Sequence, residues 1–277
     1  DKPDATTESV TEAPSQSLVA RMDTTTGSFH ASASGSTRKQ QGRTSSEYPG
    51  MKVFDTVRSV PSERWDIDSS PAPTARYGAY LRNVAHFDAA AAQISRQEAV
   101  LMDPQHRFIL EQVSETMQAM AGKVYADSFG VYVGIAGTEY GVSALEYTGP
   151  TVSVYSATGS QLSVAAGRLS YVFGLKGPSV SIDTACSSSL VSTHLGYGSL
   201  RQGECSDAIV CGVNMTLSAF TTAMFKRAGM LAEDGRCKVL DSSADGYVRS
   251  ESCGTLLLRS GDGSSREGGV VSNSVIC

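Results

Sequence analysis

The sequence has no metal-binding or disulfide pattern. Only four of its 277 residues are histidine and six are cysteine. No two cysteines have the Cys-x-x-Cys spacing of a zinc site. Disulfide frameworks are typical of small secreted domains, and none is expected in a chain of this length with scattered thiols. We therefore predict no metal centre, and we expect the cysteines other than Cys186 to be small buried apolar side chains.

Long apolar runs and clusters of positive charge are also absent. No run approaches the roughly 20 apolar residues that a membrane-spanning helix needs. The 23 basic and 28 acidic residues give a net charge of −5, without a basic stripe for nucleic acid. The chain begins with Asp1 and shows no signal-peptide pattern. We expect neither a membrane nor a nucleic-acid partner, and a cytoplasmic location, with a plastid as the alternative.

Residues 1–46 differ in composition from the remainder of the chain. They are rich in Ser, Thr, Ala, Gly and Gln, and they contain few large apolar residues. They show neither a helical nor a strand period. This composition is typical of a disordered tail or linker, because it offers too little apolar surface to form a core. The globular region is predicted to span residues 47–277.

Beyond residue 47, apolar strands alternate with helical segments. One helix is predicted to begin at Pro104, with Asp103 as its N-cap, and to end at Gly122. The pattern predicts two further helices, at 160–173 and 187–203, and four strands, at 129–135, 179–183, 207–213 and 254–259. Within the helix at 160–173, the small residues Ala165, Ala166 and Gly167 are expected to permit close packing. Strands alternating with helices indicate an α/β architecture whose sheets are covered by helices.

Cys186 stands where an apolar strand turns into a helix, in the segment GPSVSIDTACSSSLVSTHLG. The start of a helix carries about +0.5 of an elementary charge and unpaired N–H groups. A thiol at that position is expected to have a pKa below its usual value of about 8.5. The backbone N–H of Cys186 would also help to bind the oxyanion formed when a thioester is attacked. From these residues alone, the alternative is an inert core cysteine beside a serine-rich helix start.

The segment DTACSSSL (183–190) resembles the active-site signature of ketosynthases of the type I polyketide synthase and animal fatty acid synthase kind. Other segments resemble successive parts of the same family in the same order: VPSERWDID (60–68), RYGAYLRNVAHFDAA (76–90), LMDPQHRFILE (101–111), GVYVG (130–134), SATGSQLSVAAGRLSYVFGLKGPS (156–179), LRQGECSDAIVCGVN (200–214) and MLAEDGRCKVLDSSADGYVRSESCG (230–254). The resemblance covers about residues 47–260 and identifies Cys186 as the nucleophile.

The resemblance implies a thiolase-like α/β fold, layered helix, sheet, helix, sheet and helix, of which this chain holds mostly the first half. It implies that Cys186 accepts an acyl group from the phosphopantetheine arm of an acyl carrier protein. A malonyl unit on a carrier protein would then lose CO₂ and attack the acyl-cysteine. No bound cofactor is expected. A homodimer is expected, in which the strand SVSID (179–183) pairs across the two-fold axis.

The sequence departs from the family at both ends. The family has two catalytic histidines, in segments resembling HGTGT and NIGH, and a lysine before the second, and none of these occurs here. His194 is the last histidine and is expected to be structural; His86 and His106 match no catalytic position, and His30 lies in the predicted tail. The family's opening strand has no counterpart in residues 20–50. We therefore predict a partial ketosynthase domain that stops before the residues needed for condensation.

The polar residues of the loop at 233–252 are expected to form a network that holds the active-site residues in position. The resemblance favours supporting roles for Thr184, Ala185, Arg236, Lys238, Asp245, Arg249 and Glu251. The alternative is a solvated loop held by surface ion pairs, each worth about 0–1 kcal/mol.

Several functions remain open on the sequence. A β-ketoacyl synthase of polyketide biosynthesis is favoured, and the motifs do not separate it from a fatty acid synthase ketosynthase. A non-condensing protein that keeps only interaction surfaces is the alternative of another class, although the known non-condensing relatives replace the cysteine. A cysteine hydrolase would need a nearby base. Nucleotide binding by GIAGTEYG (134–141) is not expected, because its glycines lack the required spacing and following helix.

Overall fold

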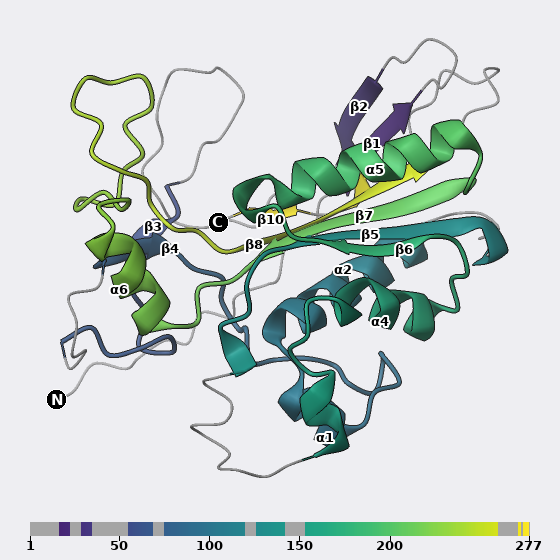
Figure 1. The fold of residues 1–277 in the computed structure, drawn as a ribbon, viewed down its shortest axis with the longest axis horizontal. Coiled ribbons are helices and arrows are strands. Elements are labelled where there is room, and N and C mark those ends of the chain that lie inside the picture. Colours follow the sequence, from purple (N-terminus) through teal and green to yellow (C-terminus); the bar gives the residue numbers. More distant parts are fainter. Residues whose placement is uncertain are drawn as a thin grey trace, which may run out of the picture.

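A five-stranded mixed sheet forms the centre of the structure, which is a computed structural model (Figure 1). The structure describes residues 55–68, 75–119, 126–141 and 153–259, and the backbone of four strands outside these ranges. The strand order is β10-β8-β7-β5-β6. The strands of this sheet are β5 (Phe129–Ile135), β6 (Ser179–Ile182), β7 (Asp207–Asn214), β8 (Ser252–Arg259) and β10 (Ser274–Ile276). β5 is parallel to both β6 and β7, whereas β8 is antiparallel to β7 and to β10.

Helices cover both faces of this sheet (Figure 1). α5 (Ser188–Gln202) packs on one face against β5 and β7, and α2 (Pro104–Ala119) and α4 (Val164–Phe173) pack on the other. β5 is buried at all seven positions, as expected for a central strand between two helical layers. The predicted α/β architecture is therefore confirmed, and the layers of the described residues form one helix–sheet–helix unit.

The helix ends follow the residues that the sequence marks. Asp103 precedes α2, and its Oδ1 accepts a hydrogen bond from the backbone N–H of Gln105 at 2.8 Å. α4 ends at Gly174 and α5 at Gly203, with φ angles of 67° and 73° in the left-handed region that suits glycine. α4 begins at Val164, later than the predicted residue 160. Gly122, the predicted end of α2, lies outside the described residues.

The main apolar core lies between the sheet and the helices α2 and α4. Ile109 and Val113, two apolar residues of α2, are fully buried in it. On the α4 side, Ala165 and Ala166 are buried, but Gly167 is exposed and a Cβ there would meet no atom within 4 Å. The expectation that Gly167 allows close packing is therefore wrong, because it lies on the outer side of α4. A smaller core beneath α5 contains Tyr132, Ile182, Leu200, Cys205, Ala208, Val210 and Leu258.

Short elements surround the layers. The hairpin pairs β3 (Val57–Ser59) with β4 (Tyr77–Ala79). The remaining helical elements are α1 (Arg96–Leu101), η1 (Ala126–Ser128), η2 (Val154–Ala157), η3 (Ala185–Ser187) and α6 (Ala219–Arg227). None of the helices in the described part of the chain is long and apolar enough to cross a membrane. The same part of the chain contains no cluster of histidine, cysteine and carboxylate residues that could hold a metal ion.

Two strands occur where the sequence predicted none. β1 (Ser17–Met22) pairs antiparallel with β2 (Phe29–Ser34) and with β9 (Val271–Ser272). The prediction that residues 1–46 contain no strand therefore differs from the structure at β1 and β2. A strand is stabilised by backbone pairing, which needs no particular side-chain period, and β9 is distant in sequence. The other residues of the predicted tail 1–46 lie outside the described residues.

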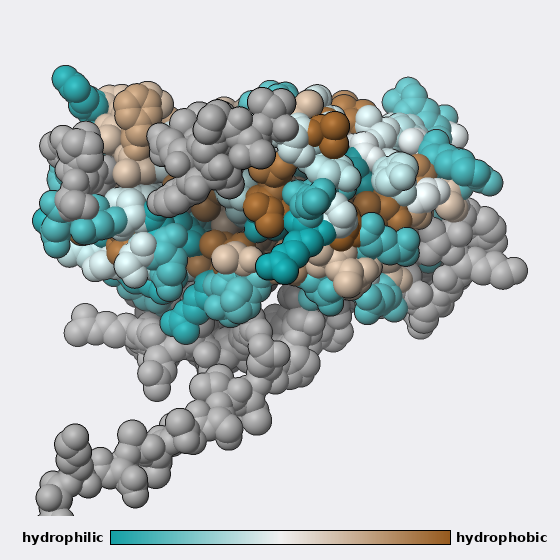
Figure 2. Space-filling model, turned by 90° about the horizontal axis from the view of Figure 1, so that it is seen from below, coloured by the Kyte–Doolittle hydropathy of each residue, from teal (hydrophilic) through white to brown (hydrophobic). Residues whose placement is uncertain are grey.

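The described surface retains apolar side chains between polar ones. Seen from below, apolar residues form patches separated by polar groups (Figure 2). Among the large apolar residues of the described helical elements, Tyr171 on α4 and Val154 on η2 are the most exposed. Single exposed apolar residues are common on proteins, and these two identify no partner by themselves.

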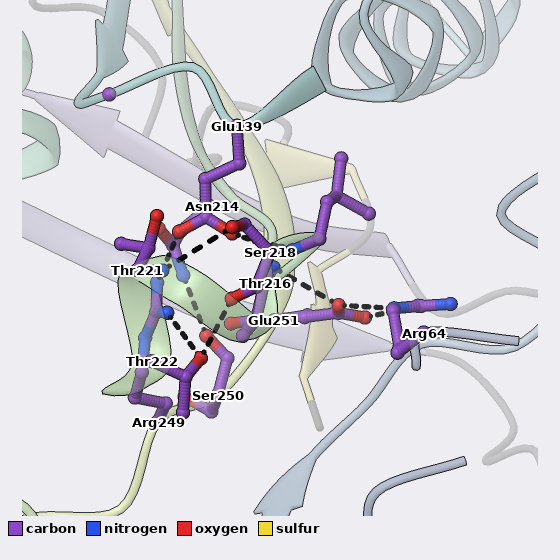
Figure 3. Close-up of polar contacts among 12 residues, drawn as sticks. Arg64, Glu139, Asn214, Thr216, Ser218, Thr221, Thr222, Arg249, Ser250 and Glu251 are labelled. Carbon is purple, nitrogen blue, oxygen red and sulfur yellow. Dashed lines mark hydrogen bonds and ion pairs between the residues drawn. The ribbon is translucent and has the colours of Figure 1, made fainter. Parts of the chain in front are cut away.

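Glu251 lies just before β8, at the centre of a buried polar junction (Figure 3). Its carboxylate accepts hydrogen bonds from Arg64 Nε at 2.8 Å and from Arg64 Nη2 at 2.6 Å. It also accepts the backbone N–H groups of Leu81 and Thr216, at 2.8 and 3.1 Å. The side chains of Arg64 and Glu251 are only 2% and 0% exposed. Four bonds to one carboxylate offset its desolvation and join four segments of the chain.

We expect the substitution Glu251→Ala to lower the free energy of unfolding by about 3–5 kcal/mol, because it leaves the buried Arg64 guanidinium without its counter-ion. Urea denaturation followed by circular dichroism measures this change. The matched control is Asp127→Ala, which removes an ion pair to Lys176 whose two side chains are 71–82% exposed. That control should unfold at the wild-type urea concentration. Equal midpoints for the two variants would show that the buried junction does not stabilise the fold.

Candidate active site

Cys186 lies in the turn between β6 and α5, at one edge of the sheet. Parallel strands have their carboxyl ends at the same edge, and ligands of open α/β sheets bind there. The segments that leave β5, β6 and β7 at this edge are 136–141, 183–187 and 215–218. Because β5 lies between β6 and β7, the segment 136–141 lies between the other two. The turn that carries Cys186 therefore lies beside the segment 136–141, at the end of the edge strand β6.

A set of short hydrogen bonds holds the turn that carries Cys186. Ser188 Oγ accepts the backbone N–H of Thr184 at 2.9 Å and donates to the carbonyl oxygen of Ala185 at 2.7 Å. Ser187 Oγ donates to the carbonyl oxygen of Thr184 at 2.8 Å, and Asp183 Oδ1 accepts the N–H of Ala185 at 2.9 Å. Ala185 has a φ of 55°, a left-handed conformation that costs a non-glycine residue about 1–2 kcal/mol. The hydrogen bonds stabilise this unfavourable backbone and hold Cys186 in a defined position.

Two glycines allow the start of α5 to lie directly on the sheet. A Cβ at Gly134 of β5 would lie 2.6 Å from the carbonyl carbon and oxygen of Ser188. A Cβ at Gly212 of β7 would lie 2.7 Å from the Cβ of Ser189. Both distances are shorter than real Cβ contacts. Only glycine at these positions lets the first turn of α5, and with it Cys186, approach the strands this closely.

The thiol of Cys186 is exposed, unlike most other cysteines of the described chain. Cys205, Cys211 and Cys253 are buried, and burial raises the pKa of all three thiols, that of Cys211 to about 12. The prediction that they are buried apolar side chains is confirmed. It is wrong for Cys237, which is exposed and whose Sγ accepts the N–H of Val248 at 3.2 Å. Cys186 is therefore one of two described thiols that an external acyl donor can reach.

None of the described histidines belongs to the turn that carries Cys186. Burial, with a smaller effect from Arg168, lowers the pKa of His106 to about 3, so this side chain is neutral and a weak base. It belongs to α2, on the sheet face opposite to α5. His194 is exposed, six residues along α5 from Ser188, or about 9 Å along the helix axis. His86 is exposed in the loop before α1.

Three of the predicted supporting residues, Arg236, Lys238 and Asp245, take part in ion pairs near the surface. Arg236 donates to both carboxylate oxygens of Asp55, at 3.0 and 2.6 Å. Lys238 pairs with Asp245 at 2.6 Å and with Asp234 at 3.2 Å. Within the described chain, none of these hydrogen bonds or ion pairs reaches residues 183–187. The supporting role of Arg236, Lys238 and Asp245 stays a prediction, and exposed pairs of this kind add little stability.

Arg249 joins a second polar cluster in which Glu139 is the central acid (Figure 3). Arg249 Nη2 lies 2.9 Å from Glu139 Oε1, and Arg249 Nη1 donates to Thr222 Oγ1 at 3.0 Å. Glu139 was not singled out from the sequence, where it appeared only within GIAGTEYG. No local pattern identifies it, because its partners Leu217, Ser218 and Arg249 follow 78–110 residues later.

We expect Gly134→Ala to displace the first turn of α5, because the added methyl group would overlap the backbone of Ser188. Overpacking of this kind costs about 1–3 kcal/mol, and urea denaturation should show the loss. The alkylation rate of Cys186 by iodoacetamide should also change. Gly167→Ala is the matched control: its Cβ meets open space, and replacing a helical glycine should stabilise the protein by about 0.5–1 kcal/mol. Unchanged stability and unchanged alkylation in Gly134→Ala would contradict this account of the close contact.

Comparison with known proteins agrees with this geometry. Residues 51–262 match the family model for the N-terminal domain of β-ketoacyl synthases. The chain is 40% identical over 218 residues to a phenolphthiocerol/phthiocerol polyketide synthase of Mycobacterium tuberculosis, covering 74% of this chain and 12% of that protein. It is 41% identical over 217 residues to the polyketide synthase GfsA of Streptomyces halstedii, covering 74% of this chain and 3% of that protein. The chain thus spans a small part of the length of these relatives.

Solved structures of ketosynthases share the fold. The ketosynthase from module 6 of the bacillaene synthase of Bacillus subtilis 168 has a TM-score of 0.64 at 37% identity, covering 73% of this chain and 34% of that one. The oxazolomycin ketosynthase domain OzmH KS7 of Streptomyces albus JA3453 has a TM-score of 0.64 at 35% identity, covering 74% and 38%. These neighbours are thiolase-like, which confirms the predicted fold class. The chain therefore belongs to the β-ketoacyl synthase family and carries the N-terminal domain of that family.

Proposed function

We propose that this chain is the acyl-accepting part of a polyketide-type ketosynthase, with Cys186 as its nucleophile. The observation that carries the proposal is an exposed thiol at the carboxyl end of β6, in a hydrogen-bonded turn that starts α5. The polyketide synthases among its relatives favour the polyketide pathway over fatty acid synthesis. A cysteine kept in this position also argues against a protein that serves only as an interaction surface.

In the proposed reaction, the Sγ of Cys186 attacks the carbonyl carbon of an acyl thioester. The carbonyl oxygen becomes an oxyanion, and in this proposal the backbone N–H of Cys186 binds it. That N–H takes no part in the hydrogen bonds that hold the turn. A donor of this kind typically contributes about 3–4 kcal/mol to the transition state. When the oxyanion collapses, the C–S bond to the donor breaks, and the departing thiol takes up the proton that Cys186 released.

The acyl donor proposed here is the phosphopantetheine thioester of an acyl carrier protein, and no cofactor bound to the chain is required. Condensation needs further donors aimed at the enolate that forms when CO₂ leaves. The two histidines and the lysine that the family uses for this step have no counterpart in residues 1–277. We therefore assign acylation to this chain and condensation to the complete domain. A cytoplasmic location stays a prediction.

The test is to incubate residues 1–277 with an acyl-pantetheine thioester and to map the adduct by mass spectrometry. We expect one acyl group on Cys186, none in Cys186→Ala, and normal labelling in the control Cys237→Ala. Since Cys186 is exposed, Cys186→Ala should leave stability unchanged. Malonyl carrier protein added to the acylated chain should yield no β-ketoacyl product. An adduct confined to Cys237 would refute the assignment of the nucleophile, and condensation by residues 1–277 would refute the proposed division of the reaction.

We also propose that β6 pairs with its copy in a homodimer. β6 is an edge strand of the sheet among the described residues, and its Val180 side chain is 38% exposed. An unprotected strand edge tends to pair with another chain. Light scattering at micromolar concentration should give twice the monomer mass for the wild type and for the control Val180→Thr. Val180→Lys should shift the mass toward the monomer, and a monomeric wild type would exclude this pairing.

A further inference from the structure

We propose that Glu139 is a positioning residue: it holds α6 and the loop before it, and through them it affects acyl transfer to Cys186. The effect on acyl transfer rests on the proposed function of Cys186. The anchoring of α6 rests on the structure alone.

α6 has little apolar packing to hold it in place. It stands apart from the layers of the sheet (Figure 1) and makes only weak contacts with the other helices and strands of the described chain. Phe220 and Met224, two of its large apolar residues, are 72% and 49% exposed. The position of α6 must therefore depend strongly on polar contacts at its start and along its side.

The carboxylate of Glu139 binds the backbone at the start of α6. Its Oε2 accepts the N–H groups of Leu217 and Ser218, both at 2.7 Å. Ser218 is the N-cap of α6, and its Oγ accepts the N–H of Thr221 at 3.3 Å. The N–H groups at a helix start lack partners within the helix, and a negative charge there is favourable. One oxygen of Glu139 thus holds the two residues that directly precede α6.

The second oxygen of Glu139 holds the side of α6 through Arg249. The Glu139–Arg249 ion pair measures 2.9 Å, and each side chain is only 11% exposed. Arg249 bonds to Thr222 of α6, and its guanidinium lies 5.1 Å from the centre of the Phe225 ring. The backbone oxygen of Arg249 accepts the N–H of Ala79 in the β3–β4 hairpin. Arg249 therefore links α6 to the β3–β4 hairpin, and Glu139 orients the guanidinium that makes this link.

The loop that carries Glu139 is itself anchored by α2. Gln105 Nε2 donates to the carbonyl oxygen of Gly137 at 3.1 Å, and Thr138 Oγ1 donates to Asp103 Oδ2 at 2.8 Å. Both Asp103 and Gln105 are buried. This loop follows β5, between the nucleophile turn after β6 and the loop after β7. Glu139 thus connects the start of α2 to α6 through a loop at the edge where Cys186 lies.

A large acyl donor and a small alkylating reagent should depend on this arrangement differently. Iodoacetamide needs only an exposed thiol at Cys186. An acyl-pantetheine thioester must also be aligned along the loops at this edge, and a displacement of about 1 Å in a positioning element can reduce a rate by up to about 100-fold. Loss of Glu139 should therefore slow acyl transfer without slowing alkylation.

The test compares Glu139→Gln, which keeps the shape and removes the charge, with Glu139→Asp, which keeps the charge. In Glu139→Gln we expect faster amide hydrogen exchange at residues 217–222 and an acyl transfer rate reduced at least about tenfold. Alkylation of Cys186 by iodoacetamide should stay within about twofold of wild type. Glu139→Asp should restore part of the acyl transfer rate. The control Asp127→Asn, in an exposed ion pair, should change none of these measurements.

Each outcome decides the proposal. Unchanged hydrogen exchange at 217–222 in Glu139→Gln would overturn the anchoring of α6. Faster exchange with acyl transfer and alkylation reduced in the same proportion would show a general loss of structure and overturn the positioning role. If the wild type accepts no acyl group while exchange rises in Glu139→Gln, the proposed function fails, the effect on acyl transfer fails with it, and the anchoring of α6 is upheld.

Discussion

The close contact between the first turn of α5 and the sheet is the constraint on which the site depends. Gly134 and Gly212 leave no Cβ between the strands and the backbone of Ser188 and the Cβ of Ser189. The helix can therefore begin directly above the carboxyl ends of β5 and β7. This contact places the first turn of α5, and with it the preceding turn in which Ala185 is left-handed and Cys186 is exposed. The position of Cys186 thus depends on the absence of side chains at two positions of the sheet.

Buried and half-buried carboxylates connect segments that are distant in the sequence. Glu251 binds Arg64 and two backbone N–H groups, Glu139 binds Arg249 and two others, and Asp103 binds the N–H of Gln105 and the hydroxyl of Thr138. Burial raises the pKa of Asp103, and its hydrogen bonds oppose that shift. Each carboxylate keeps its place because several donors compensate its loss of water. The exposed pairs of Arg236 and Lys238 involve no comparable compensation, so they contribute much less to the fold.

Much of the fold could be predicted from the sequence because its signals are local. Pro104 after Asp103 predicts the start of α2, and Gly174 and Gly203 predict the ends of α4 and α5, since each residue has a backbone preference that acts without distant partners. The strands β5 and β7 follow from continuous apolar runs between turns. β1 and β2 were missed because their pairing depends on each other and on β9, and no side-chain period is required for that pairing.

For the site, the sequence alone predicted Cys186 as the nucleophile and identified the family, because the residues around Cys186 form a contiguous motif and the other segments follow in the family's order. Only the tertiary structure decided which predicted supporting residues lie near one another. It placed Lys238 and Asp245 in a surface pair, Glu251 in a buried junction, and Glu139 between Arg249 and the start of α6. Such partners are separated by up to 187 residues, and a contact at that separation is created by packing, which no local pattern records.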